Sequence, residues 1–288
     1  MQQEWSIGLA IMIVAGLASL TLLSGFACSL WGARSLLHKE FFSYFLSPIA
    51  YAVLVVFLGV HGWLVANTLD LLQASGPRGV EWPLQHWLAS PVFWLVFLAA
   101  CPLLTMRTFA EEKASGTLEM LMTSPLSDWQ IVLAKYAGCL LFYVVLWLPT
   151  LVYLPVLGGL ELTWTKALPQ ITMSTDPAPI LTTYLGLFLA GAMFLAMGVC
   201  VSSMVRDQLV AAQATLALGV LFLAGSFAAN AMDGGAGYQL AYYMSVPLHF
   251  DRAFTRGVID LRPVTLYVSV ALFSLFLTVR SLESRRYA

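Results

Sequence analysis

The chain has 288 residues, of which 60% are apolar and 10% are charged, whereas roughly 25% of the residues in an ordinary soluble domain are charged. The mean hydropathy is +0.82, and apolar runs recur at the roughly 20-residue length that a helix needs to cross a bilayer. The formal net charge of −1 carries no basic bias, so composition excludes a water-soluble domain and gives no support to a nucleic-acid partner. It predicts an all-α integral membrane protein.

The first apolar run covers residues 5–31 and predicts a retained helix that crosses the membrane. It is too long for a signal peptide, and residues 1–4 hold no Lys or Arg. Residues 35–47 follow with apolar side chains at helical spacing on one side, which predicts a short helix in the interface plane. Ser47 and Pro48 then supply an N-cap and a proline at the first helical position, and they open a span over residues 49–67.

Five more apolar runs predict further spans, which brings the total to six or seven. They cover residues 91–106, 131–157, 180–204, 209–230 and 264–279. Residues 70–90 and 160–179 are polar and contain turn formers, so we expect loops there. Residues 233–262 are semi-polar with several Gly and Pro breakers, and we expect an extracytoplasmic segment that enters the membrane and returns.

The distribution of Lys and Arg predicts the orientation of the chain. If residues 107–130 are cytoplasmic, nine basic residues lie on that side and five on the other. Basic residues are retained on the cytoplasmic side of a bacterial inner membrane. The tail is therefore expected in the cytoplasm and the N-terminus outside.

Small residues in one predicted span mark a place of close helix packing. Ala211, Thr215 and Gly219 follow one another at four-residue spacing, which lets two helix backbones approach in lipid. This stripe predicts either an interface with a second permease subunit or ordinary packing inside the bundle, and both interpretations stay open.

Motifs for catalysis or metal binding are missing from the sequence. None of the four lysines follows a glycine, so the phosphate-binding loop of ATPases is absent, and no H-E-x-x-H or G-x-S-x-G motif occurs. The four histidines share no helix face and the cysteines are scattered, which predicts no metal site and cysteines that only pack. Charged residues are rare at span centres, which argues against a proton-driven carrier. The driving energy is expected from another chain.

The most informative segment is the polar stretch over residues 107–130. Its first part is expected to continue the preceding helix out of the membrane, with Arg107 and Glu111 at the supportive four-residue spacing. Gly116 then allows a break in the helix.

A second short helix is predicted after this break. Leu118, Leu121 and Met122 form one apolar stripe, and Pro125 ends the helix. Ser127 and Gln130 have the spacing of a capping box that starts the next span. A solvated loop with ordinary caps is one interpretation; a structured hairpin that a soluble motor subunit binds is the other.

Three stretches resemble a known family when they are taken in order. Residues 39–51, residues 109–135, and residues 249–262 together with 280–286 are similar to the matching parts of type-2 ABC exporter permeases. The similarity is greatest to the gliding-motility (Gld) type and its relatives in copper-enzyme maturation, and it runs from about residue 36 to the end.

The resemblance implies an organisation and a set of partners. Residues 35–288 would form a six-span permease domain, and residues 1–34 would be an added transmembrane helix of unknown role. A second permease, identical or related, would lie beside it in the bilayer lipid. Two ABC ATPase subunits would bind ATP and Mg, since this chain carries neither. The residues implied in ATPase coupling are Glu111, Glu112, Lys113, Gly116, Thr117, Leu118, Glu119, Leu121, Met122, Ser124, Pro125 and Asp128.

The resemblance leaves the cargo open. The mostly apolar spans suggest an amphipathic substrate that is exported or extracted from the membrane. The alternative function is an ATP-driven scaffold or mechanotransmitter that acts on a periplasmic accessory protein. A secondary carrier or channel is the third possibility, and transport driven by an ion gradient without ATP would identify it.

Overall fold

The computed structural model describes residues 31–75, 83–154, 161–164, 169–172, 177–232 and 234–286. Six helices among these residues are long and apolar enough to cross a membrane, which confirms the predicted all-α membrane core. These candidate spans are Pro48–Leu71, Pro91–Ser115, Asp128–Val152, Ala178–Met204, Gln208–Asn230 and Leu261–Ser284. The predicted additional span, residues 5–31, lies outside the described residues except for its last residue, and Cys28 lies outside them too.

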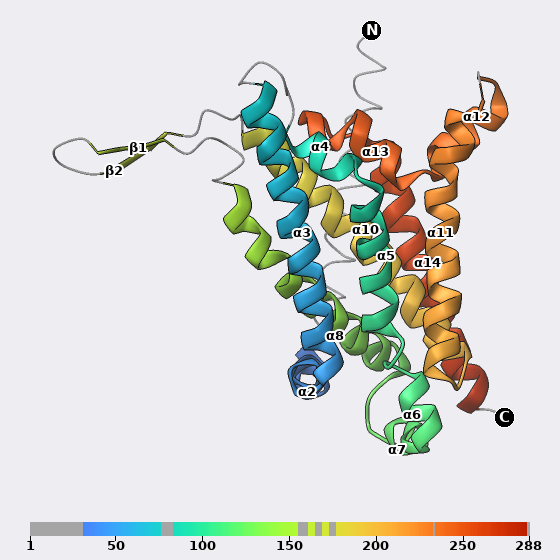
Figure 1. Ribbon diagram of the computed structural model, residues 1–288. Helices are drawn as coiled ribbons and strands as arrows, with labels where there is room; N and C mark the ends of the chain where they lie inside the picture. The colour runs from blue at the N-terminus through green and yellow to red at the C-terminus, as the bar shows by residue number, and fades with distance from the viewer. Residues whose placement is uncertain are drawn as a thin grey trace, which may run out of the picture.

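The six spans belong to six long helices, and shorter elements gather at the two ends of the bundle (Figure 1). The long helices are α3 (Pro48–Ser75), α5 (Pro91–Thr105), α8 (Asp128–Trp147), α10 (Pro177–Met204), α11 (Gln208–Asn230) and α14 (Leu261–Arg286). One end carries α2 (Arg34–Leu46), α6 (Ala110–Ser115) and α7 (Thr117–Met122). The other carries α4 (Pro83–Ala89), α12 (Ala236–Met244), α13 (Val246–Arg252) and η2 (Phe254–Arg256).

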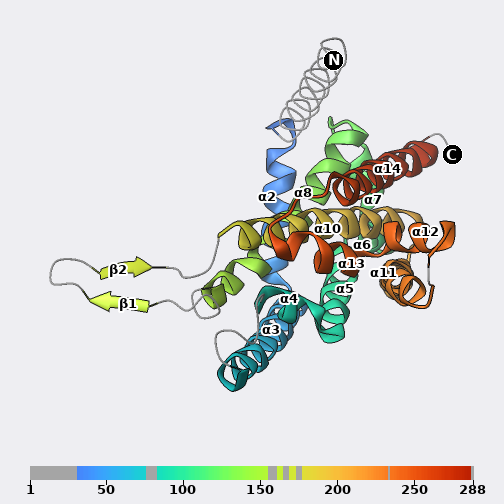
Figure 2. The ribbon, with the colours of Figure 1, turned by 90° about the horizontal axis from the view of Figure 1, so that it is seen from above.

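Three of the long helices form the inside of the bundle. In the most apolar stretches of α5, α8 and α10, 67% to 72% of the residues are buried, against 22% to 33% in α3, α11 and α14. Figure 2 shows α10 in the middle, with α14 and α8 on one side and α5 and α11 on the other. The apolar surface that α3, α11 and α14 leave exposed therefore lies on the outside of the bundle.

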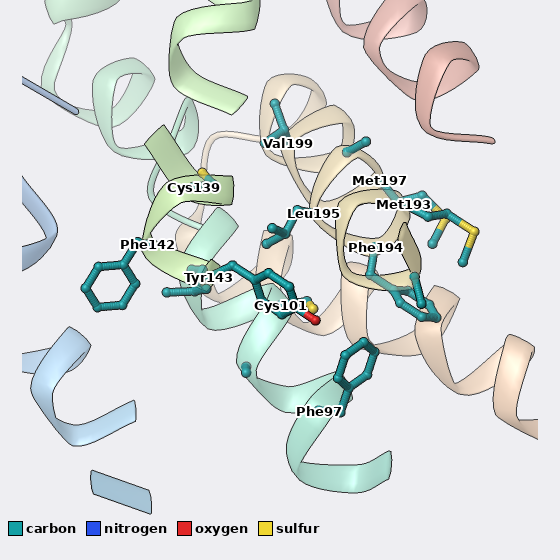
Figure 3. Close-up of a cluster of buried hydrophobic side chains, with 14 of the residues drawn as sticks. Phe97, Cys101, Cys139, Phe142, Tyr143, Met193, Phe194, Leu195, Met197 and Val199 are labelled. Atoms are coloured by element: carbon teal, nitrogen blue, oxygen red, sulfur yellow. The ribbon is translucent and has the colours of Figure 1, made fainter. Parts of the chain in front are cut away.

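The contact between α8 and α10 depends on close packing, because lipid is as apolar as the side chains and supplies no hydrophobic drive. Figure 3 shows Tyr143 of α8 and Phe97 of α5 lying against α10 beside Phe194. A Cβ atom on Gly191 would lie only 2.3 Å from the Tyr143 ring. The absence of a side chain at Gly191 is therefore what lets the ring fit.

Two predicted details differ in the structure. The predicted span 131–157 exists as the candidate span Asp128–Val152, but its α-helix, α8, ends at Trp147. A 3-10 turn, η1 (Leu148–Val152), continues the span and holds Pro149, which cannot donate a backbone hydrogen bond. The predicted loop 160–179 contains an antiparallel hairpin of β1 (Glu161–Trp164) and β2 (Pro169–Thr172), in which Glu161 pairs with Thr172.

The segment predicted to enter the membrane and return, residues 233–262, folds as α12, α13 and η2 in its described part. The α13 helix lies against α4, α11 and η2, and Gln85 Nε2 donates a 2.6 Å hydrogen bond to Asp251 Oδ1. His249 is buried and lies 3.0 Å from the Tyr267 hydroxyl through Nδ1. Burial lowers the pKa of His249 from 6.5 to about 4. The depth of these helices in a membrane stays a prediction.

Candidate coupling site

The α6 and α7 helices project beyond the end of the bundle, between the ends of α5 and α8 (Figure 1). The helix that is predicted to continue through this region is interrupted: residues 106–109 form a turn between α5 and α6. A side chain from α10 forms hydrogen bonds with the backbone groups of this turn. Ser202 Oγ accepts hydrogen bonds from the backbone N–H groups of Phe109 and Ala110, both at 3.1 Å, and lies 3.2 Å from the Met106 carbonyl.

Gly116 joins α6 to α7 in the left-handed conformation, with φ of +73°. This geometry caps the end of α6 and starts a new direction for α7, and it is costly for residues that carry a Cβ. The predicted break at Gly116 therefore exists and has a conformational cause. The predicted capping box exists as well: Gln130 N donates to Ser127 Oγ at 3.3 Å, and Ser127 N donates to Gln130 Oε1 at 3.0 Å.

The apolar stripe of α7 points toward the chain's own core. Leu118 is only 7% exposed, and Leu121 and Met122 are partly buried against the same core cluster. The opposite face of α7 is open, with Glu119 exposed and the Met120 side chain 76% exposed. A partner that approaches α7 therefore meets Glu119 and Met120 first.

A buried lysine ties α6 to the bundle. The Lys135 side chain of α8 is 1% exposed, and its Nζ donates to Glu112 Oε1 at 2.7 Å and to Glu40 Oε1 at 2.8 Å. This Glu40–Lys135–Glu112 triad joins α2, α8 and α6 at one point. Removing one partner of a buried ion pair costs about 3–5 kcal/mol, because the remaining charge is left unpaired.

Lys113 and Arg107 make further polar contacts around α6. Lys113 Nζ donates to the carbonyls of Ser203 and Val205 at the end of α10, the latter at 3.3 Å. The predicted pair of Arg107 and Glu111 forms at 3.7 Å, but Glu111 is exposed and Arg107 is only partly buried, and such pairs contribute at most about 1 kcal/mol.

The α2 helix is held in the same network. Arg107 donates to Ser47 Oγ at 2.6 Å, and the Tyr44 hydroxyl donates to the Leu104 carbonyl at 2.8 Å. Burial raises the pKa of the Tyr44 hydroxyl well above its ordinary value, so the group stays a neutral donor. Thus α2 is fixed to α5 as well as to α8.

The twelve residues predicted for ATPase coupling lie on α6, on α7, in the turns that follow these two helices, and at the start of α8. The structure does not bring the small-residue stripe near them. Ala211, Thr215 and Gly219 are buried inside the chain, and a Cβ on Gly219 would lie 2.7 Å from Leu98 of α5. The stripe is used for packing against α5, so a second subunit would have to contact other residues of α11.

Sequence reasoning missed Glu40, Lys135 and Ser202 as members of this site. A signal for Lys135 is present, since it is a lysine within an otherwise apolar helix, and such residues face a partner inside the bundle. No comparable signal marks Ser202. Among the described residues, no cluster of His, Cys, Asp or Glu has the arrangement of a metal site.

Comparison with known proteins gives one match. A family model described as ABC-2 family transporter protein matches residues 84–249, which is more than half of the chain. The matched stretch begins in α4 and ends in α13, and it includes α6, α7 and Lys135. No curated protein matches the sequence.

Proposed function

Because the chain belongs to the ABC-2 family of transporter proteins, we propose that it is the permease subunit of an exporter driven by separate ATPase subunits. Its six candidate spans make it a multi-pass membrane protein, and the family implies ATPase partners. The observation that carries the proposal is the projecting α6–α7 pair, which the Lys135 triad connects to the transmembrane helices.

The proposed docking surface is the open side of α7 and the turn that follows it. It consists of Thr117, Glu119, Met120, Thr123, Pro125 and Trp129, all exposed. Glu112, Lys113 and Leu118 were expected at the partner as well. Glu112 and Lys113 contact other residues of the chain, and Leu118 is buried. In this proposal these three residues hold α6 and α7 in place and do not contact the ATPase.

In this proposal, a movement of α6–α7 reaches the spans through the polar contacts. A push on α7 would act on α8 and α2 through Glu112 and Lys135, and on the end of α10 through Lys113. Because breaking a buried ion pair costs several kcal/mol, α6, α8 and α2 would move as one unit. Apolar contacts of the outer helices with α5 and α10 can slide at lower cost, which supports a rearrangement of α3, α11 and α14 around that unit.

ATPase subunits would bind ATP in the cytoplasm, and this sets the proposed orientation of the chain in the membrane. The α6–α7 end would face the cytoplasm of a bacterium, and the end of α14 lies on the same side (Figure 1), so the tail would be cytoplasmic in the inner membrane. ATP and Mg would bind to the ATPase subunits. A second permease, identical or related, would complete the transporter beside the outer helices.

Co-purification of the chain with a co-expressed ABC ATPase that binds it tests the docking surface. Met120→Glu places a charge on the exposed face of α7, and Met232→Glu is the matched control, since Met232 is also an exposed methionine and follows α11 at the opposite end of the bundle. We expect Met120→Glu to weaken ATPase binding about tenfold, as loss of a central contact costs roughly 1–2 kcal/mol. Equal retention of the ATPase by both variants would contradict the assignment.

The same complex in vesicles separates export from mechanotransmission. We propose export or extraction of an amphipathic substrate, so the ATPase rate should respond to lipids or amphiphiles in the vesicle. A rate that responds only to a periplasmic protein would favour the alternative function.

A further inference from the structure

A hollow of about 740 Å³ lies between α2, the start of α3, the end of α5 and the α6–α7 pair. Its volume is within the range of ligand sites, which is roughly 300–1,000 Å³. The wall toward the spans is apolar and includes Ile49, Val53 and Leu103. The wall toward α6 and α2 is charged. The hollow therefore changes from apolar along α3 and α5 to charged along α2 and α6, as a bilayer changes from acyl chains to headgroups.

The six charged side chains that line the hollow sum to zero, and they form one triad, one pair and one exposed lysine. Three are positive (Lys39, Arg107 and Lys135) and three are negative (Glu40, Glu111 and Glu112). The Lys135 triad has a formal charge of −1, because one lysine meets two carboxylates. Arg107 and Glu111 pair with each other, and Lys39 adds one positive charge on the exposed face of α2. A ligand that carries both signs and no net charge fits this pattern better than an anion.

The negative side retains capacity to accept a hydrogen bond. Glu112 Oε1 contacts Lys135, whereas Glu112 Oε2 is buried and has no hydrogen-bond partner among the described residues. A buried acceptor without a partner costs free energy. A primary ammonium group would supply the missing donor, and a quaternary one would not.

We propose that this hollow binds a phospholipid with a phosphate and a primary amine, taken from the leaflet that surrounds the α6–α7 end. The ammonium group faces the Glu40 and Glu112 carboxylates, the phosphate faces Lys39 and Arg107, and the acyl chains leave along the apolar wall of α3 and α5. The bound lipid contacts α2, α6 and α8 together, so its presence stabilises the same contacts that the triad makes.

The test uses the full-length chain alone in detergent, so its result does not depend on the ATPase or on the proposed export. Delipidated protein is titrated with short-chain phosphatidylethanolamine and, separately, phosphatidylglycerol, and bound lipid is counted by native mass spectrometry. We expect phosphatidylethanolamine to bind at least about fivefold more tightly, the ratio expected for roughly one unmatched charge. Equal affinity for the two lipids would overturn the proposal.

Two pairs of variants on α2 locate the bound lipid. Lys39→Glu reverses the charge at the hollow and should weaken phosphatidylethanolamine binding several-fold, whereas Arg34→Glu, an exposed residue that does not line the hollow, should not. Ser43→Trp places an indole ring in the hollow and should weaken binding several-fold, whereas Ser35→Trp should not. Unchanged binding in both Lys39→Glu and Ser43→Trp would place the lipid elsewhere.

Soluble phosphoethanolamine distinguishes the source of the headgroup. We expect it to compete poorly, because it has no acyl chains for the apolar wall. Competition at the same concentration as the lipid would overturn the assignment to a membrane lipid.

Discussion

Replacing Lys135 with methionine is expected to destabilise the chain strongly while preserving most of the side-chain volume. Lys135 Nζ lies 2.8 Å from Glu40 Oε1 and 2.7 Å from Glu112 Oε1. Without the ammonium group, the two carboxylate oxygens lie at most about 5.5 Å apart and repel each other by about 3 kcal/mol at an effective dielectric constant near 20. Together with the lost hydrogen bonds, the expected cost is about 3–5 kcal/mol.

Thermal unfolding of the detergent-purified chain measures this cost. We expect Lys135→Met to lower Tm by on the order of 10 °C, since 1 kcal/mol corresponds to roughly 2–4 °C in a chain of comparable size. The control is Arg34→Met, an exposed basic residue of α2 that does not line the hollow and whose replacement should change stability by less than about 0.5 kcal/mol.

A triple variant separates the charge effect from the loss of packing. Glu40→Gln and Glu112→Gln, added to Lys135→Met, remove the uncompensated carboxylates, so more than half of the lost Tm should return. Neutral replacement of a whole buried ion pair is often tolerated. An unchanged Tm in Lys135→Met, or a triple variant no more stable than the single one, would refute the role assigned to the triad.

Three further predictions concern stability elsewhere in the chain. Because His249 has a pKa of about 4 in the folded chain and about 6.5 unfolded, the unfolded state binds more protons between these values, and stability should fall as pH is lowered through that window. The contribution of His249 to this loss, at pH 5 relative to pH 7.5, is about 2 kcal/mol. It is measured as the part of the Tm difference that His249→Gln removes, and an unchanged pH response in that variant would contradict the assignment. Gly191→Ala places a Cβ 2.3 Å from the Tyr143 ring and should lower the stability of the chain by about 1–3 kcal/mol. Gly59→Ala is the control, because no atom lies within 4 Å of its Cβ, and it should be neutral or stabilising in the same Tm assay. Gly116→Ala meets no clash but forces φ of +73° on a residue with a Cβ, so it should lower stability by about 1 kcal/mol. Gly116→Asn should lower it less. Equal Tm values for Gly116→Ala and the natural chain would show that the turn is not strained.

Local sequence features predicted the local structure of the coupling region well. The capping box at Ser127 and Gln130 and the break at Gly116 both exist in the structure. Each depends on residues no more than a few positions apart, so the sequence contains the full pattern. The apolar runs likewise predicted the six long helices, because helix length and hydropathy are properties of a single segment.

Contacts between distant segments could not be predicted in the same way. Lys135 forms an ion pair with Glu40, which lies 95 residues earlier in the chain. Ser202 of α10 caps a turn more than 90 residues earlier. Periodicity showed that Leu118 lies on an apolar stripe, but an apolar stripe fits the chain's own core and a partner's groove equally well. Tertiary packing decides between them, and Leu118 is buried in the chain.

The small-residue stripe illustrates the same limit. Ala211, Thr215 and Gly219 correctly indicate a close helix contact, because spacing alone defines a face of α11. Spacing carries no information on which helix covers that face. The structure places Leu98 of α5 against Gly219, so the partner belongs to the same chain.

Site-specific photo-crosslinking tests the central claim, that the exposed face of α7 is where the ATPase binds. A photo-reactive amino acid replaces Met120 in one variant and Met232 in the other, and both are irradiated in cells that express the ATPase recovered by co-purification. The proposal predicts a crosslink to the ATPase from position 120 and none from position 232. A crosslink from position 232, or none from position 120 in a folded and expressed protein, would contradict it.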